Sequence, residues 1–147
     1  MSEEKGLNPL VMLIGGLVLA VLAVGMMLLL LRETPESVVR DFYGCKNVDQ
    51  QSMLLTSESA MLLSDRIAYQ ARYYGMSEAA LKREYGKYGP QLKEITSIEK
   101  IDAVCNEWRF DCLISVPDQK GGFNDETQTL YVIKVNDTWK IDLTRSR

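Results

Sequence analysis

The cysteines are the side chains with the greatest chemical reactivity, because the sequence has three of them and no histidine. Cys105 and Cys112 lie seven positions apart in the stretch VCNEWRFDCLI, and Cys45 is far from both in the sequence. Without histidine, a Ser-His-Asp triad, a Cys-His pair and a histidine-based metal site are all excluded. The cysteine spacing does not match a zinc site either, so we expect no metal centre.

Cys105 and Cys112 could form a disulfide. If they face each other across a hairpin with a turn of two or four residues, their β-carbons lie about 4.5–5.5 Å apart, and closer at a non-hydrogen-bonded pair, where bridging is feasible. Such a bridge would stabilise the fold by ~2–3 kcal/mol on the chain-entropy model. The alternative is two free thiols in an apolar row with Trp108 and Phe110, as expected in a cytoplasmic domain. We favour the bridge and expect Cys45 to remain a buried free thiol.

The sequence offers no motif for binding a cofactor or a nucleic acid. Gly121-Gly122 has the wrong context for a phosphate-binding loop and is better interpreted as a turn. Acidic and basic residues are interspersed and the formal net charge is −3, without the basic stripe that nucleic-acid binding requires. We expect no cofactor and no nucleic-acid partner.

A long apolar run near the N-terminus predicts a transmembrane helix. It extends from Leu10 to Leu31 without a charged residue, and at about 1.5 Å per residue it would be roughly 33 Å long, enough to cross a bilayer core. A signal peptide is the alternative, but the apolar run continues beyond the small residues at 23–25 and has a weak positive flank. We expect an N-terminal tail at residues 1–9 and an uncleaved anchor at 10–31.

Residues 34–147 predict one small α+β domain, which is long enough to bury a single core. Its first half has helical signals. In the stretch TPESVVRDFYGC, Thr34 can cap a helix and Pro35 suits its first turn. Further helices are expected from about Ser57 to Tyr74, where Gly75 is a plausible terminator, and from Ser77 to the pair Gly89-Pro90.

The second half of the domain alternates apolar and polar residues with a period of two, which is typical of strands. Asn136-Asp137 is a good two-residue hairpin turn. The simplest assembly is a four-stranded antiparallel meander with one face exposed to water and the other covered by the helices. The expected strands cover approximately residues 93–105, 108–116, 127–135 and 138–144.

With these elements, the domain resembles the small membrane-anchored members of the nuclear transport factor 2-like (cystatin-like) α+β superfamily. The resemblance rests on the opening TPESVVRDFY, with a Phe-Tyr pair near the end of the first helix, and on VNDTWKIDL, with Trp-Lys-Ile in the last strand. It implies a curved sheet that wraps a long helix to form a cone.

The resemblance also bears on the orientation of the chain. Near the anchor, Lys5 precedes the apolar run whereas Arg32, Arg40 and Lys46 follow it, and the positive-inside rule taken literally would place the domain in the cytoplasm. That rule weakens for a folded domain, and bacterial members of the superfamily often lie outside the cytoplasmic membrane. We expect a single-pass protein of the cell membrane with an extracytoplasmic C-terminal domain.

Catalysis is not expected. An isomerase-like relative would use a buried carboxylate as base and a tyrosine hydroxyl at an oxyanion, but Asp102 and Asp111 lie on strands, where carboxylates normally face solvent. A cone could also bind a small apolar ligand, although a filled core is the commoner outcome. The residues that could line such a pocket are Tyr74, Tyr85, Tyr88, Trp108 and Trp139.

Two functions therefore stay open. The first, which we favour, is a non-catalytic interaction module, anchored in the membrane as a component of an envelope protein complex. Its partners would be other membrane or envelope proteins, or a second copy of the chain. The alternative is a small-molecule-binding or isomerase-like cone domain.

Overall fold

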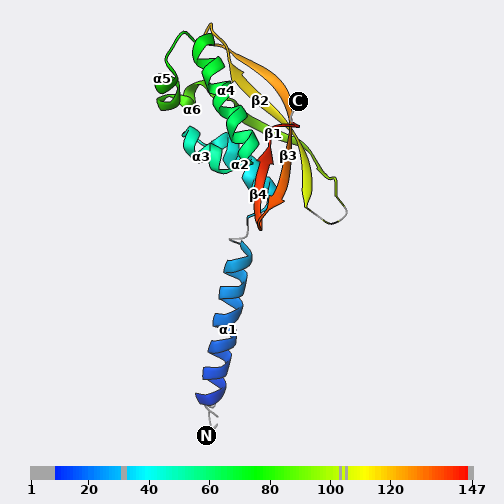
Figure 1. The fold of residues 1–147 in the computed structure, drawn as a ribbon. Coiled ribbons are helices and arrows are strands. Elements are labelled where there is room, and N and C mark those ends of the chain that lie inside the picture. Colours follow the sequence, from blue (N-terminus) through cyan, green and yellow to red (C-terminus); the bar gives the residue numbers. More distant parts are fainter. Residues whose placement is uncertain (1–8, 31–32, 103, 105, 146–147) are drawn as a thin grey trace. The chain divides into compact units, whose positions relative to one another are not determined.

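The computed structural model describes residues 9–30, 33–102, 104 and 106–145 of the 147-residue chain. The chain divides into two compact units, Met1–Arg32 and Glu33–Arg147. The described part of the first unit is a helix, and the second unit is an α+β domain, referred to below as the C-terminal domain (Figure 1).

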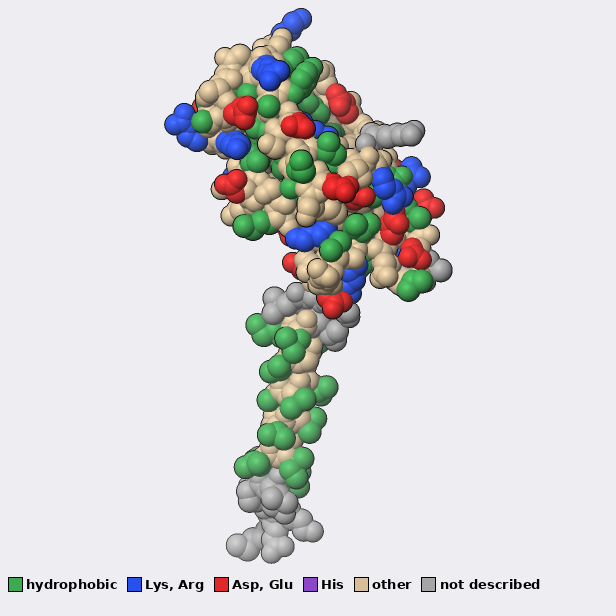
Figure 2. Space-filling model, viewed as in Figure 1, with side chains coloured by type: hydrophobic (Ala, Val, Ile, Leu, Met, Phe, Trp, Pro, Cys, Tyr) green, Lys and Arg blue, Asp and Glu red, His purple; other side chains and the backbone are tan. Residues whose placement is uncertain are grey.

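The helix of the first unit, α1 (Pro9–Leu30), is apolar on all sides. It has 22 residues, and its side chains from Val11 to Leu28 are all exposed. Figure 2 shows this stretch without acidic or basic side chains. At 1.5 Å per residue such a helix is about 33 Å long, close to the thickness of a bilayer core. It is therefore long and apolar enough to span a membrane, a property that signal sequences share.

The helix predicted after the apolar run is present as α2 (Pro35–Gly44). The side chain of Thr34 accepts a hydrogen bond from the Ser37 backbone N–H at 3.1 Å, and the Ser37 hydroxyl completes a capping box. Pro35 occupies the first turn, where its missing N–H would have had no partner in any case. The helix buries one face in the core, made of Val38, Val39, Phe42 and Tyr43.

Helix α3 (Val48–Met53) was not predicted. Asn47 caps it by accepting a hydrogen bond from the Asp49 backbone N–H at 2.8 Å. The buried side chain of Gln51 donates to the Phe42 carbonyl oxygen at 2.8 Å, which fixes α3 against the end of α2. Six residues are too few to give a recognisable helical period in the sequence.

Helix α4 (Ser57–Tyr73) confirms the predicted long helix. It ends in a Schellman motif at Gly75, which has a φ of 67°. The N–H of Gly75 donates to the Arg72 carbonyl oxygen at 3.1 Å, and the N–H of Met76 donates to that of Ala71 at 2.9 Å. The buried side chains of α4 are Ser59, Leu63, Ile67 and Ala71.

The predicted helix that starts after Ser77 is divided into two short helices, α5 (Glu78–Arg83) and α6 (Tyr85–Tyr88). The break falls at Glu84, whose φ of −105° and ψ of 18° are not helical. The side chains that pack inward are nevertheless the expected ones, Leu81, Tyr85 and Tyr88.

The second half of the domain forms the predicted four-stranded antiparallel meander, with strand order β1-β2-β3-β4. Asn136 and Asp137 have φ values of 48° and 62°, the combination that a type I′ hairpin turn requires. The strands are β1 (Gln91–Lys100), β2 (Glu107–Pro117), β3 (Phe123–Val135) and β4 (Thr138–Asp142).

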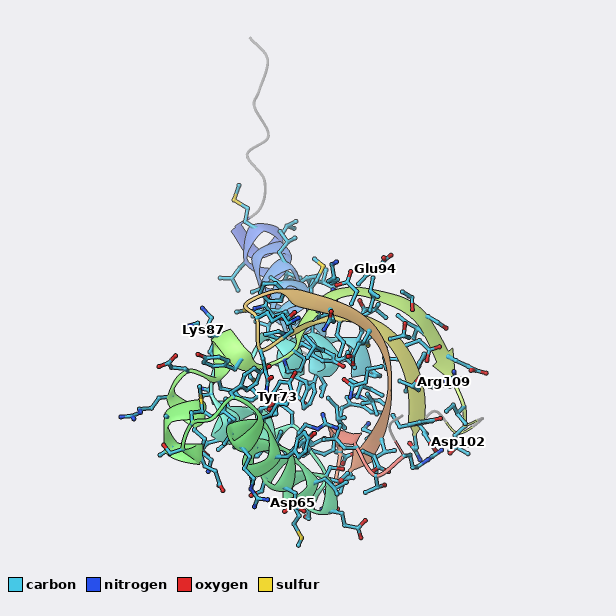
Figure 3. The ribbon with its side chains drawn as sticks, turned by 90° about the horizontal axis from the view of Figure 1, so that it is seen from above. Asp65, Tyr73, Lys87, Glu94, Asp102 and Arg109 are labelled. Carbon is cyan, nitrogen blue, oxygen red and sulfur yellow. The ribbon has the colours of Figure 1, made fainter. Side chains whose placement is uncertain are left out.

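The sheet is curved, and the helices of the domain lie on its concave side (Figures 1 and 3). Glu94 and Arg109 project from the outer face, which is exposed to solvent (Figure 3). Inward side chains of β2 and β3 pack against the buried faces of α2 and α4 in one hydrophobic core. The strand residues buried in this core are Phe110, Cys112, Ile114, Leu130 and Val132.

Strand β4 has its outer edge covered. Ile141 donates its backbone N–H to the Leu54 carbonyl oxygen at 2.8 Å and accepts from the Thr56 N–H at 3.0 Å. These bonds tie β4 to the connection between α3 and α4. Because β4 pairs with β3 only over Tyr131–Val135, the first half of β3 extends beyond the end of β4.

Strand β1 forms the other edge of the sheet, and most of its side chains are exposed. Its pairing with β2 contains two register shifts, one between Leu92 and Glu94 and one between Ile95 and Ser97. The shifts interrupt the regular hydrogen-bond ladder along this edge.

Strand β1 also ends earlier than predicted, at Lys100 instead of near Cys105. After the strand, the carboxylate of Asp102 accepts a hydrogen bond from the Val104 backbone N–H at 3.0 Å. Such a side-chain turn is typical of a loop and not of a strand. Cys105 lies outside the described residues.

Candidate functional site

A cleft of about 250 Å³ opens between α4 and the concave face of the sheet. It lies where the first half of β3 runs beyond the end of β4, so that α4 faces β3 and β2 directly. The cleft is lined by Arg66 and Gln70 of α4, Ile114 and Val116 of β2, Glu126, Thr127 and Gln128 of β3, and Pro90.

The polar side chains of the cleft have unused hydrogen-bonding capacity. The Tyr43 hydroxyl donates to the Gln128 Oε1 atom at 2.6 Å, which leaves the amide nitrogen of Gln128 as a donor. The Gln70 Oε1 atom is buried and has no hydrogen-bond partner among the described residues. Two side-chain amides at the cleft can therefore bind a further polar group.

Arg66 supplies a positive charge at the cleft. Its guanidinium forms no hydrogen bond or ion pair with another residue in the described part of the chain. Burial raises the pKa of the Tyr43 and Tyr85 hydroxyls, and the charge of Arg66 acts on both in the opposite direction.

The carboxylates expected on the strands lie outside the cleft. Asp111 projects from the outer face of the sheet, where it accepts a hydrogen bond from Thr129 at 2.7 Å and lies 3.3 Å from the Arg109 guanidinium. Asp102 belongs to the turn after β1. The buried polar side chains among the described residues are Gln51 and Ser59. The carboxylate that lines the cleft is that of Glu126, which is exposed. The cleft is therefore suited to binding by hydrogen bonds and charge.

The five predicted lining residues are dispersed over the domain. The Tyr74 hydroxyl donates a hydrogen bond to the Pro117 carbonyl oxygen at 2.6 Å. The Tyr74 ring packs on the Tyr88 ring with a distance of 5.0 Å between the ring centroids. Tyr85 lies in the core and lines a second, smaller cavity of about 150 Å³. The side chains of Trp108 and Trp139 are partly buried against the core. Of these five, none lines the cleft between α4 and β3.

The register predicted for the cysteine pair is wrong. Cys112 is a free thiol whose cross-strand partners are Ile95 on β1 and Gln128 on β3. The connection between β1 and β2 is longer than the expected turn of two or four residues, so Cys112 does not occupy a position near the hairpin tip. Cys105 lies outside the described residues, but with Cys112 free the expected bridge between the two is not found.

The described thiols have little reactivity. Burial raises the pKa of Cys112 to about 11, and the Asp111 carboxylate adds to this shift. Cys45 is a partly buried free thiol at the end of α2, and burial raises its pKa as well. Both remain protonated near neutral pH and are poor nucleophiles and metal ligands.

An exposed apolar stripe runs along α4 beside the cleft. It consists of Leu62, Tyr69 and Tyr73, whose exposed fractions are 43%, 69% and 45%. Spacings of seven and four residues place these side chains on one side of the helix. Arg66 lies between Leu62 and Tyr69 in the sequence and lines the cleft. In Figure 3, Tyr73 lies toward the sheet and Asp65 points away from it. We call these three residues the α4 stripe.

No family model matches the sequence, and no curated protein is significantly similar to it. Function must therefore be argued from the residues of the cleft and the α4 stripe.

Proposed function

We propose that the chain is a single-pass membrane protein whose C-terminal domain is a non-catalytic interaction module of an envelope protein complex. The apolar length of α1 supports the anchoring. The curved meander with α4 on its concave side supports assignment of the domain to the cystatin-like cones (Figure 1). Following the resemblance to membrane-anchored members of that group, the domain lies outside the cytoplasmic membrane.

The α4 stripe is the observation that carries the interaction role. Leu62, Tyr69 and Tyr73 are exposed although they are large and apolar. Tyrosine is enriched at the centre of protein interfaces, because its rigid ring buries a large area and its hydroxyl keeps a polar contact. A partner protein in the same membrane would cover the stripe, and anchoring would raise the effective concentration of the two surfaces.

Photo-crosslinking in membranes tests this role. A photo-reactive amino acid replaces Tyr69 or Tyr73 in the full chain, and a matched control replaces Glu94, which is exposed on the outer face of the sheet. We expect one defined protein adduct from both tyrosine positions and none from position 94. Leu62→Ser should abolish that adduct, because it removes the third member of the stripe. Identical adducts from all three positions, or only the uncrosslinked chain, would refute an interface on α4.

A second function, small-molecule binding, is favoured by the cleft. Arg66 and Gln70 line it with a guanidinium and an amide oxygen that other described residues do not engage. Buried polar atoms are usually hydrogen-bonded, so an unpaired one at a cavity indicates a place where a ligand can bind.

A further inference from the structure

We propose that the cleft binds a small monocarboxylate that also carries a hydrogen-bond donor and a short apolar group. Arg66 is the anchor for the carboxylate, and the amides of Gln70 and Gln128 hold the polar part of the ligand. This inference rests on the second function proposed above, small-molecule binding, and is independent of the α4 stripe as a protein interface.

The charge of Arg66 selects an anion. Three arginines of the domain are paired with carboxylates, namely Arg40, Arg109 and Arg145. In the described part of the chain Arg66, Arg72 and Arg83 are not, and of these three Arg66 is the one that lines the cleft. A guanidinium presents a planar fork of N–H donors that matches a carboxylate in geometry and charge.

The side-chain amides of Gln70 and Gln128 determine which other polar groups the ligand needs. Gln128 accepts from Tyr43 at 2.6 Å and so offers N–H donors to the cleft. Gln70 offers a buried acceptor, its Oε1 atom, without a partner among the described residues. A ligand that satisfies both amides needs an acceptor and a donor in addition to its carboxylate, as a secondary amide has.

The size and the walls of the cleft limit the remainder of the ligand. About 250 Å³ corresponds to roughly eight water molecules at about 30 Å³ each, so the ligand has on the order of ten non-hydrogen atoms. Ile114, Val116 and Pro90 form apolar walls, which favour a short aliphatic group.

Glu126 sets the charge of the ligand. It lines the same cleft as Arg66, and its carboxylate repels a second negative charge. The cleft therefore favours a monoanion over a dianion such as inorganic phosphate. An N-acylated amino acid has this chemistry, and so has the last residue of a peptide with a free C-terminus.

A matched pair of ligands tests the assignment on the full chain in detergent micelles. N-acetyl-leucine carries the carboxylate, the amide and the aliphatic group, whereas N-acetyl-leucinamide replaces only the carboxylate by an uncharged amide. In NMR titrations we expect the acid to bind at least tenfold more tightly than the amide. Inorganic phosphate should not compete with the acid.

Two variants and a control connect this preference to the cleft. Arg66→Gln should weaken binding of the acid at least tenfold and leave binding of the amide unchanged, because it removes only the charge. Gln70→Leu should weaken both ligands. Arg72→Gln makes the same change as Arg66→Gln at another exposed arginine of α4, which does not line the cleft, and should bind both ligands as the wild type does.

Peptides distinguish the two sources of such a carboxylate. A tetrapeptide ending in leucine is compared with its C-terminally amidated form. If the peptide acid binds more than tenfold more tightly than N-acetyl-leucine, the source is a chain end. Equal or weaker binding of the peptide acid assigns the cleft to a free small molecule. Both results support the carboxylate site.

Three outcomes overturn the proposal. If the wild type binds the acid and the amide equally, the cleft does not recognise a carboxylate, although it still binds a ligand. Unchanged acid binding by Arg66→Gln would exclude Arg66 as the anchor. Binding of neither ligand, with the crosslink from Tyr69 intact, would refute the small-molecule function and leave the interaction module standing.

Discussion

Tyr43 connects the hydrophobic core with the cleft. Its ring is buried on α2 and packs edge-on against Phe42 with ring centroids 5.1 Å apart. Its hydroxyl reaches Gln128, 85 positions later in the chain, on β3. One residue thus stabilises the packing of α2 on the sheet and orients an amide of the proposed ligand site.

Removing this hydroxyl should have a measurable cost. Tyr43→Phe is expected to lower the free energy of unfolding by about 1 kcal/mol, because it deletes a partly buried hydrogen bond while keeping the ring. Urea denaturation of the full chain in micelles, followed by tryptophan fluorescence, measures the change. Tyr69→Phe is the control, since that hydroxyl is exposed and has no hydrogen bond to the described residues. Equal effects of the two substitutions would contradict the role given to the Tyr43–Gln128 bond.

The individual residues of the cleft could not be predicted from the sequence. Arg66 and Gln70 lie at the border of the buried face of α4, where charged and polar residues are ordinary. Their significance depends on the part of β3 that faces them, and this pairing is fixed only by the folded sheet. The absence of histidine, by contrast, excluded several catalytic sites at once, because it is a property of composition.

At the scale of elements, predictions succeeded where the signal was local. Thr34 and Gly75 terminate helices through bonds to their near neighbours, and Asn136-Asp137 forms its turn through its own backbone angles. The end of β1 was missed because Asp102 continues the strand-like pattern in the sequence, although its carboxylate accepts a turn hydrogen bond from Val104.

Gly75 offers a test of one such terminator. Its φ of 67° is in the left-handed region, so Gly75→Ala should lower the free energy of unfolding by about 1–2 kcal/mol. Gly44→Ala is the matched control: its φ is not in that region, and an added β-carbon would meet no atom within 4 Å. The control should be neutral or stabilising by up to about 1 kcal/mol.

The same urea denaturation measures both glycine variants. A loss of stability in Gly44→Ala that equals the loss in Gly75→Ala would show that the backbone conformation at Gly75 is not the cause.

At the scale of the whole molecule, orientation in the membrane is the prediction with the widest consequences. Both variants of this test are made in a Cys105→Ser background, which removes the native thiol outside the described residues. In Lys120→Cys the new thiol lies in the exposed β2–β3 turn, whereas Cys112 is buried and Cys45 is partly buried. A membrane-impermeant maleimide should label this variant equally in intact and lysed cells. Ser2→Cys, in the N-terminal tail, should be labelled only after lysis. The reverse pattern would place the domain in the cytoplasm.

The fold class was predictable because it depends on the periodicity of apolar residues, and many residues contribute to that pattern. Helical spacing in the first half and alternation in the second were enough to predict an α+β domain with an antiparallel meander, as observed. The cleft could not be predicted, because it depends on how far β3 extends beyond the end of β4. The alternation of apolar and polar residues does not reveal this difference in strand length.

The irregular edge of β1 has a consequence for crowding. In the proposed anchored state, copies of the chain share a surface on which they meet far more often than in solution. A straight, regular edge strand could then pair with the same strand of a neighbouring copy, and repeated pairing would form a continuous sheet. The two register shifts make β1 irregular, and the charges of Lys93, Glu94, Glu99 and Lys100 oppose pairing of this edge with a second copy. In that proposed state we therefore expect β1 to resist fibrous polymerisation between copies of the chain.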